Sequence, residues 1–193
     1  MEDRDYIDME DLFVDDVLED AKKKERKPKL KSKQKGNRVE LELCKKLTEH
    51  FGDEFSRSVG SGNRWGQVNY LPEHARKTLI GDLCVPEGFK WVIECKGGYD
   101  SDVDFSSVLD GGCARIDEFI EQSTFDAGQC GRLPIIFWKR SRKPWVSLLK
   151  CCDMPLCRKG DPWFNHMMNY GDWRIVSTDA LLANTERTFW FEK

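Results

Sequence analysis

Three charged side chains occur in a stretch whose other residues are apolar enough for the centre of a β-sheet. They are Asp82, Glu94 and Lys96, the last two in a Glu-x-Lys spacing. Two carboxylates in a buried setting repel each other unless a positive charge lies between them. A hard divalent cation prefers carboxylate oxygens, and a neighbouring ammonium group can activate a water or neutralise charge that develops on a phosphate. These residue types therefore indicate phosphodiester hydrolysis, with Mg²⁺ as the expected cofactor and Mn²⁺ as its substitute.

The segments that carry these charges predict two strands of a β-hairpin. Residues 80–85 and 90–98 are the two apolar runs, and the turn between them contains Gly88, which can adopt a positive φ. Side chains alternate along a strand, so the glutamate and the lysine share a face, and an ordinary register puts the aspartate across from them. A solvated Glu–Lys pair beside a turn-capping Asp is the alternative for each residue alone, whereas the complete set favours a metal site.

An Asp followed on the next strand by Glu-x-Lys resembles the PD-(D/E)xK nuclease superfamily. Gly81-Asp82 stands where the superfamily often has Pro-Asp, and Glu94-Cys95-Lys96 is the second half of the pattern. The resemblance implies an α/β, restriction-endonuclease-like core in which a mixed β-sheet is flanked by helices. It also implies that Asp82 and Glu94 bind the cation and that Lys96 orients or activates the attacking water.

Two upstream runs, in the same order, are similar to archaeal-type Holliday junction resolvases of that superfamily. Residues 35–43, Lys-Gly-Asn-Arg-Val-Glu-Leu-Glu-Leu, look like their opening helix, with Glu40 at the position that reaches the metal site. Residues 57–61, Arg-Ser-Val-Gly-Ser, are similar to their Arg-Ser-x-Gly-Ser. The resemblance implies that Glu40 joins the catalytic and metal-binding set and that Arg57 and Ser61 contact DNA.

Other basic residues near these motifs are candidates for DNA binding, namely Lys35, Arg38 and Arg64. Arg64 lies in residues 63–79, a basic and aromatic stretch that departs from the resolvases, which usually reach their Asp sooner. This insertion could contact DNA, or it could be a packed cover over the site.

A glutamine completes the candidate catalytic set. The matching helix of the resolvases often brings a Gln near the catalytic Lys, and Gln122 lies on a helix predicted over residues 112–128. A surface glutamine without a role is the alternative for this position.

The predicted elements follow the order αβββαβ of the expected core. In chain order they are a helix over residues 36–50 ended by Gly52, a strand entering a loop at 55–62, the two hairpin strands, a helix over 112–128, and strands over 133–139 and 144–150.

The remaining C-terminal residues predict a smaller extension from about residue 151. Residues 172–176 and 187–191 are expected to be strands, with a short helix between them capped by Ser177 or Thr178. The last strand is apolar enough for the core or for a dimer face. A zinc site could be formed by Cys151, Cys152, Cys157 and His166. However, no C-x-x-C pair is present, and the spacing of these residues fits no common structural zinc pattern.

Charge divides the N-terminal end from the rest. Residues 1–20 hold ten acids and one base, and residues 21–35 hold nine bases and one acid, whereas the whole chain has a net charge of −3. We expect residues 1–35 to be a flexible tail and linker ahead of a nuclease-like domain over 36–193. The acidic part could be a solvated tail or an amphipathic peptide that docks on a protein partner, and the basic part could be a phosphate-binding arm.

The sequence contains no apolar run long enough for a transmembrane span, and the acidic N-terminus lacks the features of a signal peptide. Cys44, Cys84 and Cys95 fall at apolar positions, where cysteine behaves as a small hydrophobe in a reducing compartment. We therefore expect a cytoplasmic protein that is not secreted, located in the host cytoplasm if it is viral.

These inferences predict a Mg²⁺-dependent endodeoxyribonuclease that acts on branched DNA, in particular on four-way junctions. Resolvases cut two strands symmetrically, so the resemblance also implies a two-fold symmetric homodimer. A nuclease of the same fold with another specificity (restriction, repair or exonucleolytic) is an alternative, because fold does not determine substrate. The second alternative is a non-catalytic module that binds DNA or protein.

Overall fold

The computed structural model of the chain describes residues 32–58, 72–73, 79–155 and 167–192. Several predictions fall on residues outside this described part, namely those for the acidic and Lys-rich segments of residues 1–31, for Ser61, for Arg64, for the side chain of Lys35, and for Cys157 and His166. These stay predictions.

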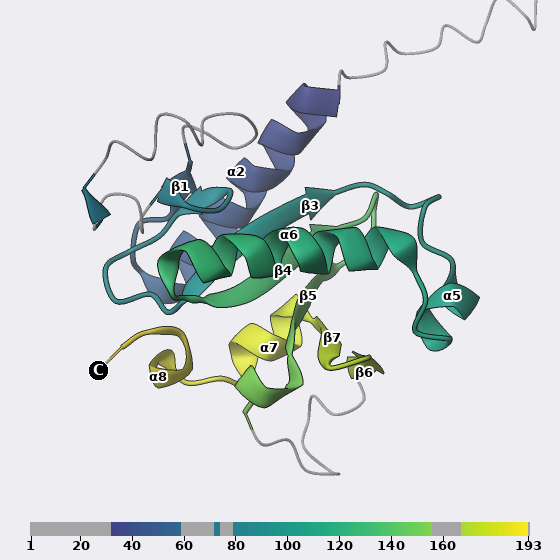
Figure 1. Ribbon diagram of the computed structural model, residues 1–193. Coiled ribbons are helices and arrows are strands. Elements are labelled where there is room, and N and C mark those ends of the chain that lie inside the picture. The colour runs from purple at the N-terminus through teal and green to yellow at the C-terminus, as the bar shows by residue number, and fades with distance from the viewer. Residues whose placement is uncertain (1–31, 59–71, 74–78, 156–166, 193) are drawn as a thin grey trace, which may run out of the picture. The chain divides into compact units, whose positions relative to one another are not determined.

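A five-stranded mixed sheet forms the centre of the fold (Figure 1). Its strands lie in the order β3-β4-β5-β7-β6. Their bounds are β3 Trp91–Gly97, β4 Leu133–Lys139, β5 Trp145–Lys150, β6 Met167–Tyr170 and β7 Trp173–Ser177. Strands β3 and β4 are parallel and the other neighbours are antiparallel. Parallel strands need a crossover, and the chain between β3 and β4 supplies one through helices α5, Phe105–Leu109, and α6, Ala114–Cys130.

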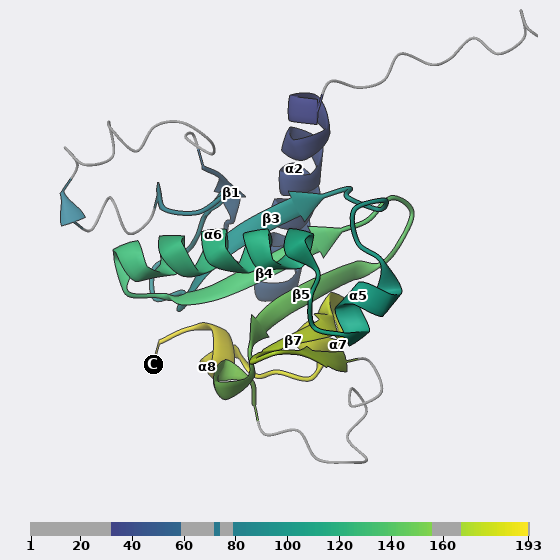
Figure 2. The same ribbon diagram turned by 45° about the vertical axis from the view of Figure 1, so that its right-hand side comes forward.

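Alternating side chains give the sheet two apolar faces, each covered by a helix. In β4, Ile135 and Phe137 pack in one core cluster with side chains of helix α2, Ser32–Phe51, whereas Ile136 and Trp138 pack in a second cluster with side chains of α6. Both ribbon views show α6 in front of β3 and β4, with α2 behind them (Figures 1 and 2). The predicted α/β class, with a mixed sheet flanked by helices, is therefore confirmed.

The helices expected at both ends of the core are present with small changes of boundary. Helix α2 begins at Ser32, four residues earlier than predicted, and is followed by Gly52 at φ +78°. Helix α7, Thr178–Ala183, is capped by Ser177, whose hydroxyl accepts from the Ala180 N–H. None of the described helices has the length and apolar character required to span a membrane.

The predicted hairpin of residues 80–85 and 90–98 is wrong in its first strand. Strand β2 contains only Leu83–Cys84 and pairs antiparallel with β1, Ser56–Arg57, in a separate two-stranded sheet. It is linked to β3 through a hydrogen bond from the Asp82 N–H to the Ile93 carbonyl, 2.9 Å long. The predicted positive φ of the turn glycine is confirmed, since Gly88 has φ +74°.

The last predicted strand is also wrong, because residues Arg187–Trp190 form a short helix, α8. This turn directs Trp190 into an aromatic cluster with Phe51 and Phe89, while Phe191 makes an isolated bridge with Phe89. Of the two alternatives, core or dimer face, Trp190 and Phe191 lie in the core. Strand β6 and helix α5 were not predicted.

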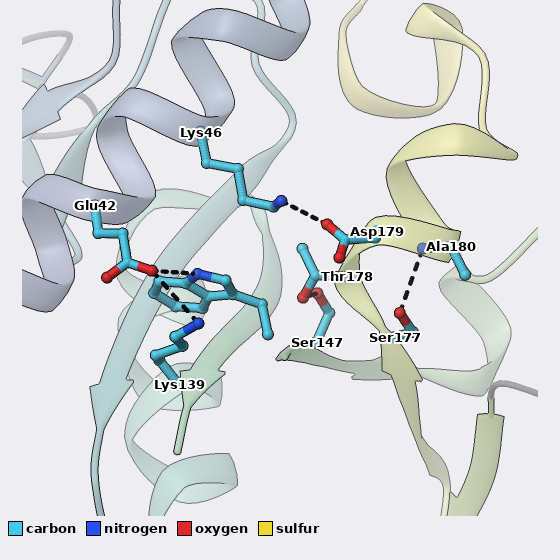
Figure 3. A network of polar contacts seen from close by, with 9 residues as sticks. Glu42, Lys46, Lys139, Ser147, Ser177, Thr178, Asp179 and Ala180 are labelled. Atoms are coloured by element: carbon cyan, nitrogen blue, oxygen red, sulfur yellow. Dashed lines mark hydrogen bonds and ion pairs between the residues drawn. The ribbon is translucent and has the colours of Figure 1, made fainter. Parts of the chain in front are cut away.

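Polar contacts fasten α2 to the sheet and to α7 (Figure 3). Glu42 accepts a hydrogen bond of 3.0 Å from the Trp145 indole N–H and lies 3.5 Å from the Lys139 ammonium. Lys46 forms an ion pair of 2.5 Å with Asp179 at the start of α7. Helix α2 is therefore held in a defined orientation on the sheet by residues that the candidate site does not use.

Candidate active site

Asp82 lies against β3 because the chain approaches the strand closely at the preceding glycine. Gly81 has φ +93°, and a Cβ atom there would lie 2.8 Å from the Ile93 carbonyl oxygen. The Asp82 N–H donates to that carbonyl, and the Asp82 carboxylate accepts from the Cys95 N–H at 2.8 Å. Asp82 is thus hydrogen-bonded to the backbone of Ile93 and of Cys95, the residues on either side of Glu94. A proline cannot adopt this φ, which accounts for the departure from the Pro-Asp of the superfamily.

Glu94 and Lys96 point toward α6, as their spacing on the strand predicts. Glu94 is 2% exposed, and the Lys96 ammonium lies 2.5 Å from its carboxylate. The same ammonium donates to the Gln122 side-chain oxygen at 2.6 Å and lies over the Phe119 ring of α6. The structure therefore brings together four of the predicted catalytic residues, which are Asp82, Glu94, Lys96 and Gln122.

The two acids of this group hold their protons more strongly than ordinary carboxyl groups. Burial raises the pKa of Asp82 to about 6, with a further increase from Glu40 and an opposing effect from the Cys95 N–H. Burial and then the charge of Asp82 raise the pKa of Glu94 to about 8, although Lys96 opposes this. Two neighbouring carboxylates that repel each other, one buried and one half-buried, fit a divalent cation, because such an ion favours their charged forms and prefers oxygen ligands.

Asp126 is a further acid of this site that the sequence analysis did not single out. It is 7% exposed and lies one turn beyond Gln122 on α6, on the buried side of that helix. Its charge raises the pKa of both Asp82 and Glu94, while burial raises its own pKa and Lys96 opposes that increase. The spacing of four residues from Gln122 was the signal in the sequence that could have identified it.

Glu40 lies on the side of α2 that faces Arg57. Its carboxylate accepts a hydrogen bond of 2.5 Å from the Arg57 Nε, and the Arg57 Nη2 donates to the Asn37 side-chain oxygen at 2.9 Å. The residue that follows β1 connects Arg57 and Glu40 to Asp82, because the Ser58 N–H donates to the Asp82 carbonyl at 2.9 Å. Glu40 is therefore paired with an arginine, while its charge still acts on Asp82.

The predicted set of three metal ligands is gathered only in part. No group of three or more His, Cys, Asp or Glu side chains within the described residues lies close enough to hold a metal ion. Asp82 and Glu94 are the pair whose chemistry fits a cation, and Glu40 as a third ligand stays a prediction. Of the predicted DNA contacts, Arg57 pairs with Leu83, the residue after Asp82, and Arg38 is exposed on α2.

One protein family matches this chain, and its description is "Phage putative PDDEXK endonuclease". The match covers residues 31–180 and includes every predicted site residue. No curated protein and no solved structure matches the chain. The superfamily inferred from Asp82 and from Glu94-Cys95-Lys96 is confirmed, and the observed sheet and helices agree with its restriction-endonuclease-like fold. The finer likeness to archaeal-type Holliday junction resolvases stays a prediction.

Proposed function

The chain belongs to this phage PDDEXK endonuclease family, and we propose that it is a metal-dependent endodeoxyribonuclease. The observation that carries the proposal is the pair of a half-buried Asp82 and a buried Glu94, with the Lys96 ammonium 2.5 Å from the glutamate. A folded protein gains no stability from two neighbouring acids with raised pKa values. Their presence together at the middle of β3 is explained by a ligand that neutralises them.

The residues around the pair have separate roles in hydrolysis. Asp82 and Glu94 would hold Mg²⁺ or Mn²⁺, which supplies positive charge to the phosphate and activation of the attacking water. Lys96, held between Glu94 and Gln122, orients that water and can exchange a proton at its Nζ. Arg57 offers N–H donors to phosphate oxygens and stabilises their charge in the transition state.

Branched DNA is the substrate class that we propose, with the four-way junction as its main example. The support is the similarity of residues 35–43 and 57–61 to the corresponding runs of Holliday junction resolvases. Symmetric cutting of a junction requires two active sites related by a two-fold axis, so a homodimer belongs to the same proposal. Light scattering of the protein with and without junction DNA tests the dimer.

Cleavage assays with Mg²⁺ on four DNA forms test the activity and the substrate together. Wild-type protein, Glu94→Gln and Glu42→Gln are incubated with four-way junction, flap, duplex and single-stranded DNA. We expect junction cleavage by the wild type and by Glu42→Gln, and none by Glu94→Gln. Cleavage of duplex or single strands in preference to junctions would contradict the branched substrate. No cleavage of any form, with Mg²⁺ or Mn²⁺, would favour a non-catalytic binding module.

A further inference from the structure

Arg57 is held by two acceptors from the same side of helix α2. Glu40 accepts from its Nε at 2.5 Å and Asn37 accepts from its Nη2 at 2.9 Å. These two α2 residues are three positions apart, which makes them neighbours on the helix surface. Asn37 belongs to the run similar to resolvases, but neither the motif nor its spacing gave it a role.

The backbone of Arg57 is placed by strand pairing, whereas its guanidinium is placed by α2. Arg57 pairs with Leu83 in the β1–β2 register, and the Ser58 N–H donates to the Asp82 carbonyl at 2.9 Å. The arginine therefore starts close to a proposed metal ligand. Its side chain is 28% exposed, so part of it can reach a ligand outside the protein.

The two contacts with α2 occupy one edge of the guanidinium, and within the described part of the chain no hydrogen bond engages the other edge. Arginine has five N–H donors in a planar fork, and α2 engages the Nε–H and one Nη2–H. The Nη1 donors and the second Nη2–H form the opposite edge, which has the geometry of a bidentate contact with phosphate. A single acceptor at Nε allows the guanidinium plane to turn, whereas a second acceptor at Nη2 defines that plane.

We infer that Asn37 is a positioning residue for the phosphate contact of Arg57. It does not touch DNA, and it acts by orienting the guanidinium so that its remaining donors meet an oxygen of the reacting phosphodiester. The inference rests on the proposed nuclease function. Because Asn37 is uncharged, its removal alters the direction of the donors and leaves the net charge of the site unchanged.

This distinction predicts an effect on the rate of cleavage rather than on affinity. Affinity for DNA and its dependence on salt follow the number of phosphates that are neutralised, which is a matter of charge. Correct orientation is needed mainly in the transition state, where it lowers the barrier. A variant of Asn37 should therefore cleave slowly at saturating DNA and still bind DNA as the wild type does.

Two nearly isosteric substitutions test the inference. Asn37→Leu removes the acceptor and Asn37→Asp retains one in the same place. Single-turnover cleavage at saturating DNA with Mg²⁺ should fall about tenfold for Asn37→Leu, the effect of losing one hydrogen bond to a charged group, and should stay within about twofold for Asn37→Asp. Fluorescence anisotropy in EDTA should give Asn37→Leu the same DNA affinity and the same salt dependence as the wild type.

A double-mutant cycle with Arg57 separates orientation from a general structural role. Lysine keeps the charge but has no Nη2 atom, so Asn37→Leu should cause no further loss of rate in an Arg57→Lys background. Asn37→Ala carries the same expectation and favours a helix, which covers the case in which Asn37→Leu does not fold.

The outcomes distinguish this inference from the proposed function. A full cleavage rate for folded Asn37→Leu or Asn37→Ala, or additive losses with Arg57→Lys, would overturn the inference while the nuclease remains. A wild-type protein that cleaves no DNA would overturn the proposed function, and the inference with it.

Discussion

Two clusters of charged side chains in this fold have their charges arranged in opposite ways. Around Glu42 and Lys46, each charge lies near one of opposite sign, and the side chains are partly exposed (Figure 3). Around Asp82 and Glu94, a half-buried acid lies beside a buried one with the buried Asp126 nearby, and the ammonium of Lys96 only partly offsets them. Glu40 and Glu42 lie two residues apart on one helix and belong to different clusters.

The difference indicates what each cluster contributes to the molecule. Exposed opposite charges add a little stability and require no ligand. Buried like charges destabilise the fold, and such groups typically occur where a bound ligand or a reaction needs them. We therefore expect substitutions in the first cluster to affect stability slightly and substitutions in the second to affect function strongly.

The largest expected effect comes from Glu94→Gln. Loss of this ligand should reduce junction cleavage by roughly a thousandfold or more, because a bound cation contributes several kcal/mol to stabilising the transition state. The matched control is Glu42→Gln, which keeps an oxygen that can accept from the Trp145 indole. Rates measured side by side with Mg²⁺ should leave this control within about twofold of the wild type, and an equal loss in both variants would remove the distinction between the clusters.

The close approach at Gly81 gives a second contrast. Gly81 and Gly131 both have a positive φ, +93° and +68°, but a Cβ at Gly81 would lie 2.8 Å from backbone while nothing lies within 4 Å at Gly131. Alanine at Gly131 should cost about 1 kcal/mol of unfolding free energy. Alanine at Gly81 should cost about 1–3 kcal/mol more and should abolish cleavage by displacing Asp82. Urea unfolding measures the stability, and equal costs at the two positions would contradict the close approach.

The pH dependence of stability tests the repulsion within the buried pair. The fold raises the pKa of Glu94 from 4.5 to about 8, so between these values the folded protein binds more protons than the unfolded chain. Unfolding free energy in EDTA should therefore fall as the pH rises through this range, by on the order of a few kcal/mol. The fall should be smaller in Glu94→Gln. Parallel profiles for the two proteins would argue against the raised pKa.

The smallest effect is expected in the network of Figure 3. Lys46→Ala removes an ion pair with Asp179, whose side chain is 64% exposed. Thermal unfolding should show a loss of only about 0.2–1 kcal/mol, and less in high salt, because solvent and ions screen such pairs. Cleavage should be unchanged. A large loss of activity would mean that the orientation of α2 depends on this pair more than its exposure indicates.

The parts of the fold that local patterns determine were predictable from the sequence. The apolar runs of β4 and β5 and the inward side chains of α6 gave nearly correct boundaries. The pairing of β2 was missed because its partner, β1, is distant in sequence, and because Gly81 turns the chain against β3 by a backbone approach that residue types do not reveal. Strand and helix were confused at residues 187–191, since their apolar density suits either.

The candidate site likewise has residues that local patterns predicted and residues whose placement depends on packing between distant elements. Alternation along β3 was enough to predict that Glu94 and Lys96 share a face, and the resemblance supplied Gln122. The contacts of Arg57 with Glu40 and Asn37 depend on how α2 packs beside β1, which no local pattern contains. Asp126 was overlooked because it belongs to none of the motifs, although its spacing of four residues from Gln122 puts it on the same side of the helix.

Calorimetric titration of Mn²⁺ into the DNA-free protein tests the shared cation most directly. The wild type and Glu42→Gln should bind the ion equally, and Asp82→Asn should bind it at least about tenfold more weakly, because one of two carboxylate ligands has lost its charge. Equal binding by the wild type and Asp82→Asn, or no binding by either, would contradict the account.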